Sequence, residues 1–220
     1  MPDETQSPLN HLLMKVNKPI FAIQTDNTIN FISKNFDFFT TGFKENTGSR
    51  ILAFVPAVRL ESLGDESFKK RHKLKYPYIA GAMANGITSA AMVKTMAHNG
   101  MMGFFGAGGL SIKKIEENII DLKTCLKDMP FGFNLIHSLG DPDHEMATID
   151  LYLRHGITRI SAAAFMRITP ALVYYRIKGI YRDSRGWIVT PNNIIAKVSR
   201  IEIARQFFSP PPEKLVALLL

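Results

Sequence analysis

The stretch Met101-Met-Gly-Phe-Phe-Gly-Ala-Gly-Gly-Leu-Ser111, with the segment 112–126 that follows it, decides the fold class of this chain. Its first five residues are an apolar run of strand length, and three glycines then permit a tight turn. Ser111 is a residue type that commonly caps helices, and apolar side chains recur at helical spacing from Ile112 to Leu126. The stretch therefore predicts a buried strand, a glycine-rich loop and an amphipathic helix.

The same strand, loop and helix pattern recurs on both sides of this stretch, from Tyr76 onward. Polar caps and prolines mark helix starts at Thr88 or Ser89, at Asp141-Pro142 and at Thr169-Pro170. A surface hairpin is expected over 181–189. Strands are expected at residues 78–82, 101–105, 131–136, 157–162 and 194–198. Alternation of strands and helices is typical of a parallel α/β sheet.

The rhythm of five strand and helix units leaves two α/β architectures open, a doubly wound sheet and an eight-stranded barrel. A complete barrel needs about 250 residues, whereas about 145 of the 220 residues follow Tyr76. The last three of a barrel's eight strands would then be missing. The chain ends in the apolar run Leu215–Leu220, which we interpret as an interruption.

Residues 1–75 have a different pattern and are interpreted as a small α+β preface to the repeated units. Apolar stretches at 19–23 and 28–32 flank the polar turn Thr25-Asp26-Asn27, which predicts a β-hairpin. The preface ends in a basic run from Lys69 to Lys75, for which a solvated linker and a contact with an acidic protein are both open. The predicted domains therefore divide after residue 75, and the second of them is 76–220.

The composition describes a basic globular protein. Hydrophobic residues make up 46% and charged residues 21% of the chain, which argues against disorder, and the net charge of +8 favours acidic partners. No zinc-ligand spacing or RNA-binding aromatic motif accompanies this charge, so neither a metal nor a nucleic acid is expected. The absence of a secretory signal and of an apolar run of bilayer length predicts a cytoplasmic protein without a membrane segment. The single Cys125 is expected to be a buried thiol.

The glycine cluster 103–109 invites comparison with a dinucleotide-binding fingerprint, in which backbone amides approach a phosphate. The comparison fails at the third required glycine, where Ser111 stands. Two interpretations stay open: a tight loop that lines a flavin or acyl pocket, and a plain turn.

Five motifs follow one another along residues 76–200. They are Tyr76-Pro-Tyr-Ile-Ala-Gly-Ala-Met-Ala-Asn-Gly86, Gly103-Phe-Phe-Gly-Ala-Gly-Gly-Leu110, Pro130-Phe-Gly-Phe-Asn-Leu-Ile-His-Ser138, Ser161-Ala-Ala-Ala-Phe165 and Ile195-Ala-Lys-Val-Ser-Arg200. In this order they resemble the PfaD-type enoyl reductases of polyunsaturated-fatty-acid and polyketide synthases, within the wider nitronate monooxygenase-like superfamily of FMN barrels. The resemblance extends from Leu52 to Leu220.

The resemblance implies a partial (β/α)8 TIM barrel, made of about the first five strand and helix units and preceded by the α+β preface. It implies FMN as the cofactor, NADPH as the electron donor, and reduction of enoyl thioesters that are tethered to an acyl carrier protein. Other synthase components are expected as partners. Carrier proteins are typically acidic, so docking of the carrier on the run Lys69–Lys75 is a hypothesis.

Four residues match positions that contact the flavin in this superfamily. The resemblance assigns backbone contacts with the flavin ring to Ala82 and Met83. It assigns a hydrogen bond with the ring or its ribityl chain to Asn134, and a cation near the ring to Lys197. Plainer alternatives stay open, namely core filler for Met83, a loop cap for Asn134 and a solvated strand end for Lys197.

Three other residues are pocket candidates without an assigned role, namely His137, Ser138 and Arg167. The resemblance identifies no catalytic acid. It also leaves a gap, because the family's Gly-Gly-His segment after the sixth strand and its phosphate-binding glycine loops have no counterpart in this sequence. Two rival interpretations therefore stay open: a nitronate-oxidising flavoenzyme, and an inactive or split-gene fragment completed by a second polypeptide. A homo-oligomer is a further option.

Overall fold

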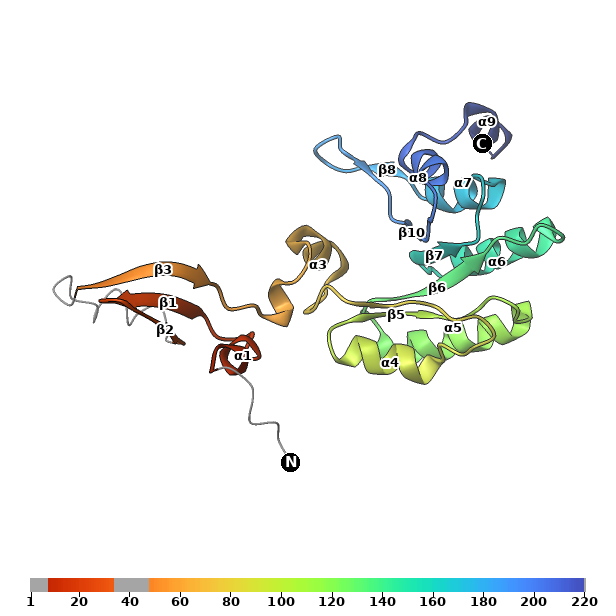
Figure 1. Ribbon diagram of the computed structural model, residues 1–220. Coiled ribbons are helices and arrows are strands. Elements are labelled where there is room, and N and C mark those ends of the chain that lie inside the picture. The colour runs from red at the N-terminus through yellow and green to blue at the C-terminus, as the bar shows by residue number, and fades with distance from the viewer. Residues whose placement is uncertain (1–7, 34–47, 220) are drawn as a thin grey trace. The chain divides into compact units, whose positions relative to one another are not determined.

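The computed structural model describes residues 8–33 and 48–219 (Figure 1). The chain forms two compact units that divide between Phe68 and Lys69. The domain division expected after residue 75 stays a prediction. Within the described ranges, none of the helices combines the length and the apolar character needed to cross a bilayer. The cytoplasmic location also stays a prediction.

The first unit contains a three-stranded antiparallel sheet with the order β2-β1-β3. Its elements are α1 (Pro8–Leu13), β1 (Ile20–Thr25), β2 (Thr28–Ile32), β3 (Ser49–Val55) and the short 3-10 helix η2 (Leu60–Ser62). Thr25 pairs with Thr28, so β1 and β2 form the hairpin expected there. Asp26 adopts the left-handed conformation (φ 52°) that such tight hairpin turns use. Helix α3 (Glu66–His72) runs across the division between the units.

The second unit alternates strands and helices in the expected order. One sheet contains β4 (Ile79–Ala80), β5 (Met102–Phe105), β6 (Phe131–Ile136), β7 (Arg159–Ala163) and β10 (Asn193–Ala196). The helices are α4 (Ala90–His98), α5 (Ile112–Leu126), α6 (Pro142–Arg154), α7 (Pro170–Ile177), α8 (Ile201–Phe208) and α9 (Glu213–Leu219). The surface hairpin is formed by β8 (Tyr181–Arg182) and β9 (Ile188–Val189).

Side-chain caps explain where four of these helices begin. Ser89, Ser111, Asp141 and Thr169 each accept a hydrogen bond from the backbone N–H three residues later. Asp141 and Thr169 are followed by a proline, whose fixed φ suits the first helical position. The helix starts expected from the sequence are confirmed, and Ser89 rather than Thr88 is the cap of α4.

The strands of the parallel sheet have the order β10-β7-β6-β5-β4, so strands that are adjacent in sequence are adjacent in space (Figure 1). All four pairings are parallel. A doubly wound sheet reverses its strand order at a switch point, whereas a barrel adds each strand beside the last. The sequential order therefore excludes the doubly wound sheet, which the strand spacing had left open. The expected first five units of a (β/α)8 barrel are confirmed.

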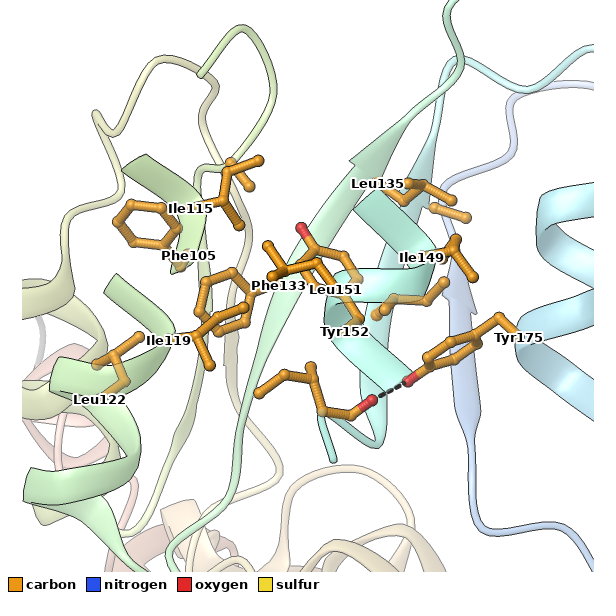
Figure 2. Close-up of a cluster of buried hydrophobic side chains, with 14 of the residues drawn as sticks. Phe105, Ile115, Ile119, Leu122, Phe133, Leu135, Ile149, Leu151, Tyr152 and Tyr175 are labelled. Carbon is orange, nitrogen blue, oxygen red and sulfur yellow. Dashed lines mark hydrogen bonds between the residues drawn. The ribbon is translucent and has the colours of Figure 1, made fainter. Parts of the chain in front are cut away.

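One hydrophobic core lies between this sheet and its helices (Figure 2). Alternate strand residues enter it, because successive side chains of a strand lie on opposite faces. The strands contribute Phe105, Phe133, Leu135, Ile160 and Ala162. The helices contribute, among others, Val93, Ile115, Ile119, Leu122, Ile149, Tyr152, Leu172 and Tyr175. Because α4, α5, α6 and α7 share this core, they cover the same face of the sheet.

Two buried tyrosines attach α6 to β6 and α7 to the segment just before β7. The Tyr152 hydroxyl donates to the carbonyl of Asn134 at 2.8 Å. The Tyr175 hydroxyl donates to the carbonyl of Ile157 at 2.8 Å, the dashed line in Figure 2. Burial raises the pKa of both hydroxyls, which keeps them protonated and able to donate.

The opposite, inner face of the sheet is lined by different residues. Phe104 lies over Gly132, where an added Cβ would come within 2.3 Å of the Phe104 ring. Asn134 pairs with Ser161, and Ser161 pairs in turn with Ile195, so these three positions share the inner face. This face leads to the carboxyl ends of the strands, where barrel enzymes carry their sites.

Cys125 lies on the exposed side of α5, so the expectation of a buried thiol is wrong. The buried residues of this helix are Ile115, Ile119, Leu122 and Leu126. A step of one residue turns a helix by about 100°. Cys125 is therefore carried off the buried stripe even though its neighbour Leu126 belongs to it.

His72, the last residue of α3, contacts the first residue of β7 within the second unit. It is buried, and its Nδ1 accepts a hydrogen bond from Nε of Arg159 at 3.3 Å. An accepting nitrogen must be unprotonated, so the contact requires a neutral imidazole. Burial, and then the positive charges of Arg159 and Arg71, lower the pKa of His72.

Acid is expected to weaken this contact. Because the folded state lowers the pKa of His72, the histidine's contribution to stability is complete above about pH 6.5 and is lost as the pH falls below it. His72→Asn keeps an acceptor near Nδ1 but does not titrate. Urea unfolding between about pH 7 and pH 5 should therefore show a smaller loss of stability for this variant than for the wild type.

His98→Asn, at the exposed end of α4, is the matched control and should respond to acid like the wild type. Equal acid sensitivity of His72→Asn and the wild type would contradict the role given to His72.

Candidate functional site

Two loops interlock at the carboxyl ends of β4 and β5. The N–H groups of Asn85 and Gly86 donate to the carbonyls of Gly108 and Gly106 at 2.7 and 2.8 Å. The N–H of Gly106 donates in return to the carbonyl of Thr88 at 3.0 Å. The loops 81–88 and 106–110 therefore form one hydrogen-bonded structure, which we call the rim.

Thr88 fixes the shape of the first loop from inside. Its buried hydroxyl accepts from the N–H of Met83 at 2.8 Å and donates to the carbonyl of Gly81 at 3.0 Å. Its backbone N–H donates to the carbonyl of Met83 at 3.3 Å. The N–H of Met83 is thus used within the loop, and the part of Met83 open to a ligand is its side chain, since the residue is 47% exposed.

Lys197 joins the two ends of the sheet. Its ammonium, just past β10, donates to the carbonyl of Ala82 at 3.2 Å, although 115 positions separate the two residues in sequence. The backbone N–H of Lys197 continues the sheet by donating to Ala162 at 2.8 Å. The N–H of Ala82 has no acceptor within the described ranges. The first and fifth strands therefore bring a cation and a spare N–H donor to the same place.

Asn134 presents a buried amide of fixed orientation. The residue is 2% exposed, and its Oδ1 accepts from the N–H of Gly108 at 3.0 Å. This bond assigns the other amide atom as Nδ2, which has two N–H groups and donates to no atom in the described part of the chain. Asn134 lines a cavity of about 440 Å³, the first cavity, between the glycine-rich loop and the start of α6.

The predicted site residues divide into two groups. Ala82 and Lys197 touch each other, and Gly108 links Asn134 to the rim that carries Met83. His137 and Ser138 border the first cavity and also a second cavity of about 500 Å³ between α6, α7 and α9. Arg167 borders the second cavity and not the first. The flavin roles assigned to the first group stay a prediction.

Two buried polar residues at the site had no functional signal in the sequence. Thr88 was expected only as a helix cap. Glu145 stands in the first turn of α6, where an acidic residue ordinarily favours the helix start from the surface. Its position four residues before Ile149 places it on the buried stripe of α6, and this spacing was the available signal.

Comparison with known proteins assigns this geometry to a family. A sequence profile described as nitronate monooxygenase matches residues 66–189. The chain belongs to the nitronate monooxygenase family. Proteins of the nitronate monooxygenase family are in general flavin-dependent. The relationship inferred from the five sequence motifs is confirmed.

Proteins similar to the chain include a polyketide biosynthesis protein and a synthase component. The chain is 43% identical over 164 residues to Polyketide biosynthesis protein PksE of Bacillus subtilis, a match that covers 74% of this chain and 21% of PksE. It is 36% identical over 208 residues to a component of the polyunsaturated fatty acid synthase of Thraustochytrium sp., covering 94% and 13% of the two chains. The chain thus spans about a fifth or less of the length of these relatives.

A solved structure is similar to a large part of this chain. The enoyl reductase domain of MlnA, from the macrolactin biosynthesis cluster of Bacillus amyloliquefaciens, superimposes with a TM-score of 0.71 at 41% identity. The match covers 73% of this chain and 37% of the MlnA chain. The half-barrel described above therefore has the architecture of a known enoyl reductase domain.

Gly106→Ala tests the interlocked rim. An added Cβ would lie 1.8 Å from the carbonyl oxygen of Met83, so the loop 81–88 would have to move. Overpacking of this kind costs about 1–3 kcal/mol, and we expect urea unfolding to show a loss at the upper end of that range. Gly140→Ala is the matched control, because its Cβ would meet nothing within 4 Å. Equal stability of the two variants would contradict the described rim.

Proposed function

We propose that this chain is part of an FMN-dependent enoyl reductase that acts on carrier-bound enoyl thioesters in polyketide or polyunsaturated-fatty-acid synthesis. The contact between Lys197 and Ala82 carries the proposal, because it sets a cation beside a spare N–H donor at the carboxyl ends of the barrel strands. Similarity to an enoyl reductase domain, to a polyketide biosynthesis protein and to a polyunsaturated fatty acid synthase component supports the substrate class.

The donors at this site fit an isoalloxazine ring. The edge of that ring presents carbonyl oxygens and ring nitrogens that accept hydrogen bonds. Ala82 offers its backbone N–H, Asn134 offers Nδ2, and Lys197 uses only one of its three ammonium hydrogens on Ala82. These three residues would hold the ring. Bound FMN, reduced by NADPH, would supply the hydride that adds to the double bond.

The chain's own residues would orient the reactants and exclude water. Gly108 prevents the Asn134 amide from rotating, so the donor keeps its direction before the ligand arrives. The ammonium of Lys197 is held at 3.2 Å from Ala82 and offers positive charge to an electron-rich ring edge. The rim covers the carboxyl ends of β4 and β5, which limits access of water to bound reactants.

Oxidation of a nitronate is a second candidate activity, because the matching family profile is that of nitronate monooxygenase. Both activities would use the same flavin site. Assaying the FMN-loaded protein with a nitronate and with an enoyl thioester separates them, and the proposal requires reduction of the thioester.

The basic run is the proposed docking surface for the acyl carrier protein. The last turn of α3 carries Lys69, Lys70, Arg71 and His72. Lys70, Arg71 and Lys73 are exposed, so their charges can face a partner. Complementary charge chiefly speeds association and selects the partner, which suits transient delivery of a tethered substrate.

Asn134→Asp tests the proposed flavin contact. A carboxylate has the shape of the amide and still accepts from Gly108, but it cannot donate and it repels an electron-rich ring edge. Losing such a bond costs about 0.5–1.5 kcal/mol, and 1.4 kcal/mol corresponds to tenfold in Kd. Titration of flavin fluorescence should show a Kd for FMN raised about tenfold.

Asn118→Asp, on α5, is the control for this test and should bind FMN like the wild type. An unchanged Kd in Asn134→Asp would remove Asn134 from the site. A wild-type chain that does not bind FMN would refute the flavin site as a whole.

Charge reversal tests carrier docking. The double variant Lys70→Glu/Lys73→Glu should bind an acidic acyl carrier protein about tenfold more weakly, with less dependence on salt. Lys113→Glu/Lys214→Glu makes the same change of net charge elsewhere and should bind like the wild type. Unchanged carrier binding in the first variant, or the same loss in both, would end the docking proposal.

A further inference from the structure

A buried carboxylate stands at the centre of a hydrogen-bonded network beside the first cavity. Glu145 is 4% exposed. Its Oε1 accepts from the hydroxyl of Thr169 at 2.6 Å, and its Oε2 lies 2.8 Å from Nδ1 of His137. The backbone N–H of Ser138 also points at Oε2, at 3.4 Å. A carboxylate removed from water needs such donors to compensate its charge.

This network decides where the proton of His137 lies. Thr169 caps α7, and its hydroxyl oxygen accepts from the N–H of Leu172 at 3.5 Å, which leaves its hydrogen for Glu145. An ionised Glu145 can only accept, so Nδ1 of His137 carries the proton between them. In the neutral imidazole Nε2 is then unprotonated, whereas in the imidazolium Nε2 carries a second proton.

The imidazole of His137 is held in place, and its Nε2 forms no hydrogen bond with the described residues. The ring stacks on Phe165, with 5.1 Å between ring centroids and 29° between the planes. The residue borders both cavities. The second cavity has mostly apolar walls, to which Leu139, Met146 and Ile168 contribute. A cavity of this character suits an acyl chain.

His137 and Asn134 both border the first cavity, which they reach from opposite faces of the sheet. Asn134 belongs to the inner face. His137 lies two positions after Leu135 and four after Phe133, so the alternation of side chains places it on the face that these two residues turn toward the helices. A flavin held by Asn134 would thus reach the first cavity, and an acyl chain in the second cavity would meet it beside His137, which borders both cavities.

We propose that His137, oriented by Glu145, donates the proton that completes reduction of the enoyl thioester, whose acyl chain lies in the second cavity. This inference rests on the proposed function. Once hydride has reached the β-carbon, the α-carbon holds an electron pair shared with the thioester carbonyl. The Nε2–H bond of the imidazolium breaks and a C–H bond forms at the α-carbon. Histidine returns to the neutral tautomer that Glu145 holds, and solvent restores the Nε2 proton.

His137→Asn tests this proposal. Asparagine can still donate to Glu145 from near the place of Nδ1, but it has no atom at the place of Nε2. The FMN-loaded chain is reduced without oxygen and mixed with crotonyl-pantetheine, and reoxidation of the flavin is followed by absorbance. The variant should slow this reaction about 10²–10⁴-fold. Its reoxidation by ferricyanide, which needs no proton on carbon, should keep the wild-type rate.

His98→Asn, at the exposed end of α4, is the matched control and should keep both rates. Equal slowing with both oxidants would show a structural role and overturn the proposal, as would an unchanged rate with the thioester. If wild-type reduced flavin reacts with ferricyanide but not with the thioester, the proposed function itself fails.

The tautomer of His137 provides a readout that needs no cofactor. Nitrogen NMR of the wild-type chain should show a protonated Nδ1 and an unprotonated Nε2 in the neutral ring. The reverse tautomer would overturn the proposal.

Discussion

All four helices α4, α5, α6 and α7 bury their apolar stripes against the same face of one parallel sheet, and the rest of the barrel unit depends on this constraint. Phe133 and Leu135 face those helices. On the other side, Gly132 gives the Phe104 ring space that a side chain would fill. The strands of a twisted parallel sheet that builds a barrel wrap around a common axis, with the helices outside, so the sheet curls away from its helices. The curl explains how Lys197 reaches Ala82 across 115 positions of sequence.

Buried polar groups hold the site in one conformation through hydrogen bonds with neighbouring residues. Thr88 uses its hydroxyl twice to shape the loop that carries Ala82. Asn134 uses its Oδ1 to accept from Gly108, and its Nδ2 donates to no atom among the described residues. Glu145 collects three donors and thereby sets the proton of His137. In a low-dielectric interior such networks are rigid when satisfied, which is the condition for holding reactants in one geometry.

The sequence predicted what local patterns determine. The strand expected at 131–136 has those bounds in the structure, and the caps at Ser111, Asp141 and Thr169 stand where expected. The helical spacing of apolar residues in α5 predicts which side of the helix is buried. The apolar neighbours of Cys125, taken without that spacing, led to the wrong expectation that its thiol is buried. Periodicity and capping depend on residues a few positions apart, and for this reason they can be read without the fold.

Other features depend on contacts between distant residues and were not predictable in this way. Strand spacing could not decide between a doubly wound sheet and a barrel, because both repeat the same unit. The use of the Met83 N–H by Thr88 follows from a loop conformation and not from a motif. Glu145 has the sequence context of an ordinary helix start, and only the packing of Thr169 and His137 around it shows its burial.

The most direct measurement of the central claim is an NMR cross-relaxation experiment between the two ends of the sheet. A Cβ built on Gly81 would lie 4.0 Å from Cε of Lys197 and 3.7 Å from its Nζ. The curled sheet therefore predicts a cross-peak between the α-protons of Gly81 and the ε-protons of Lys197. Assigned resonances for both residues without this cross-peak would contradict the closure of the sheet and the site built on it.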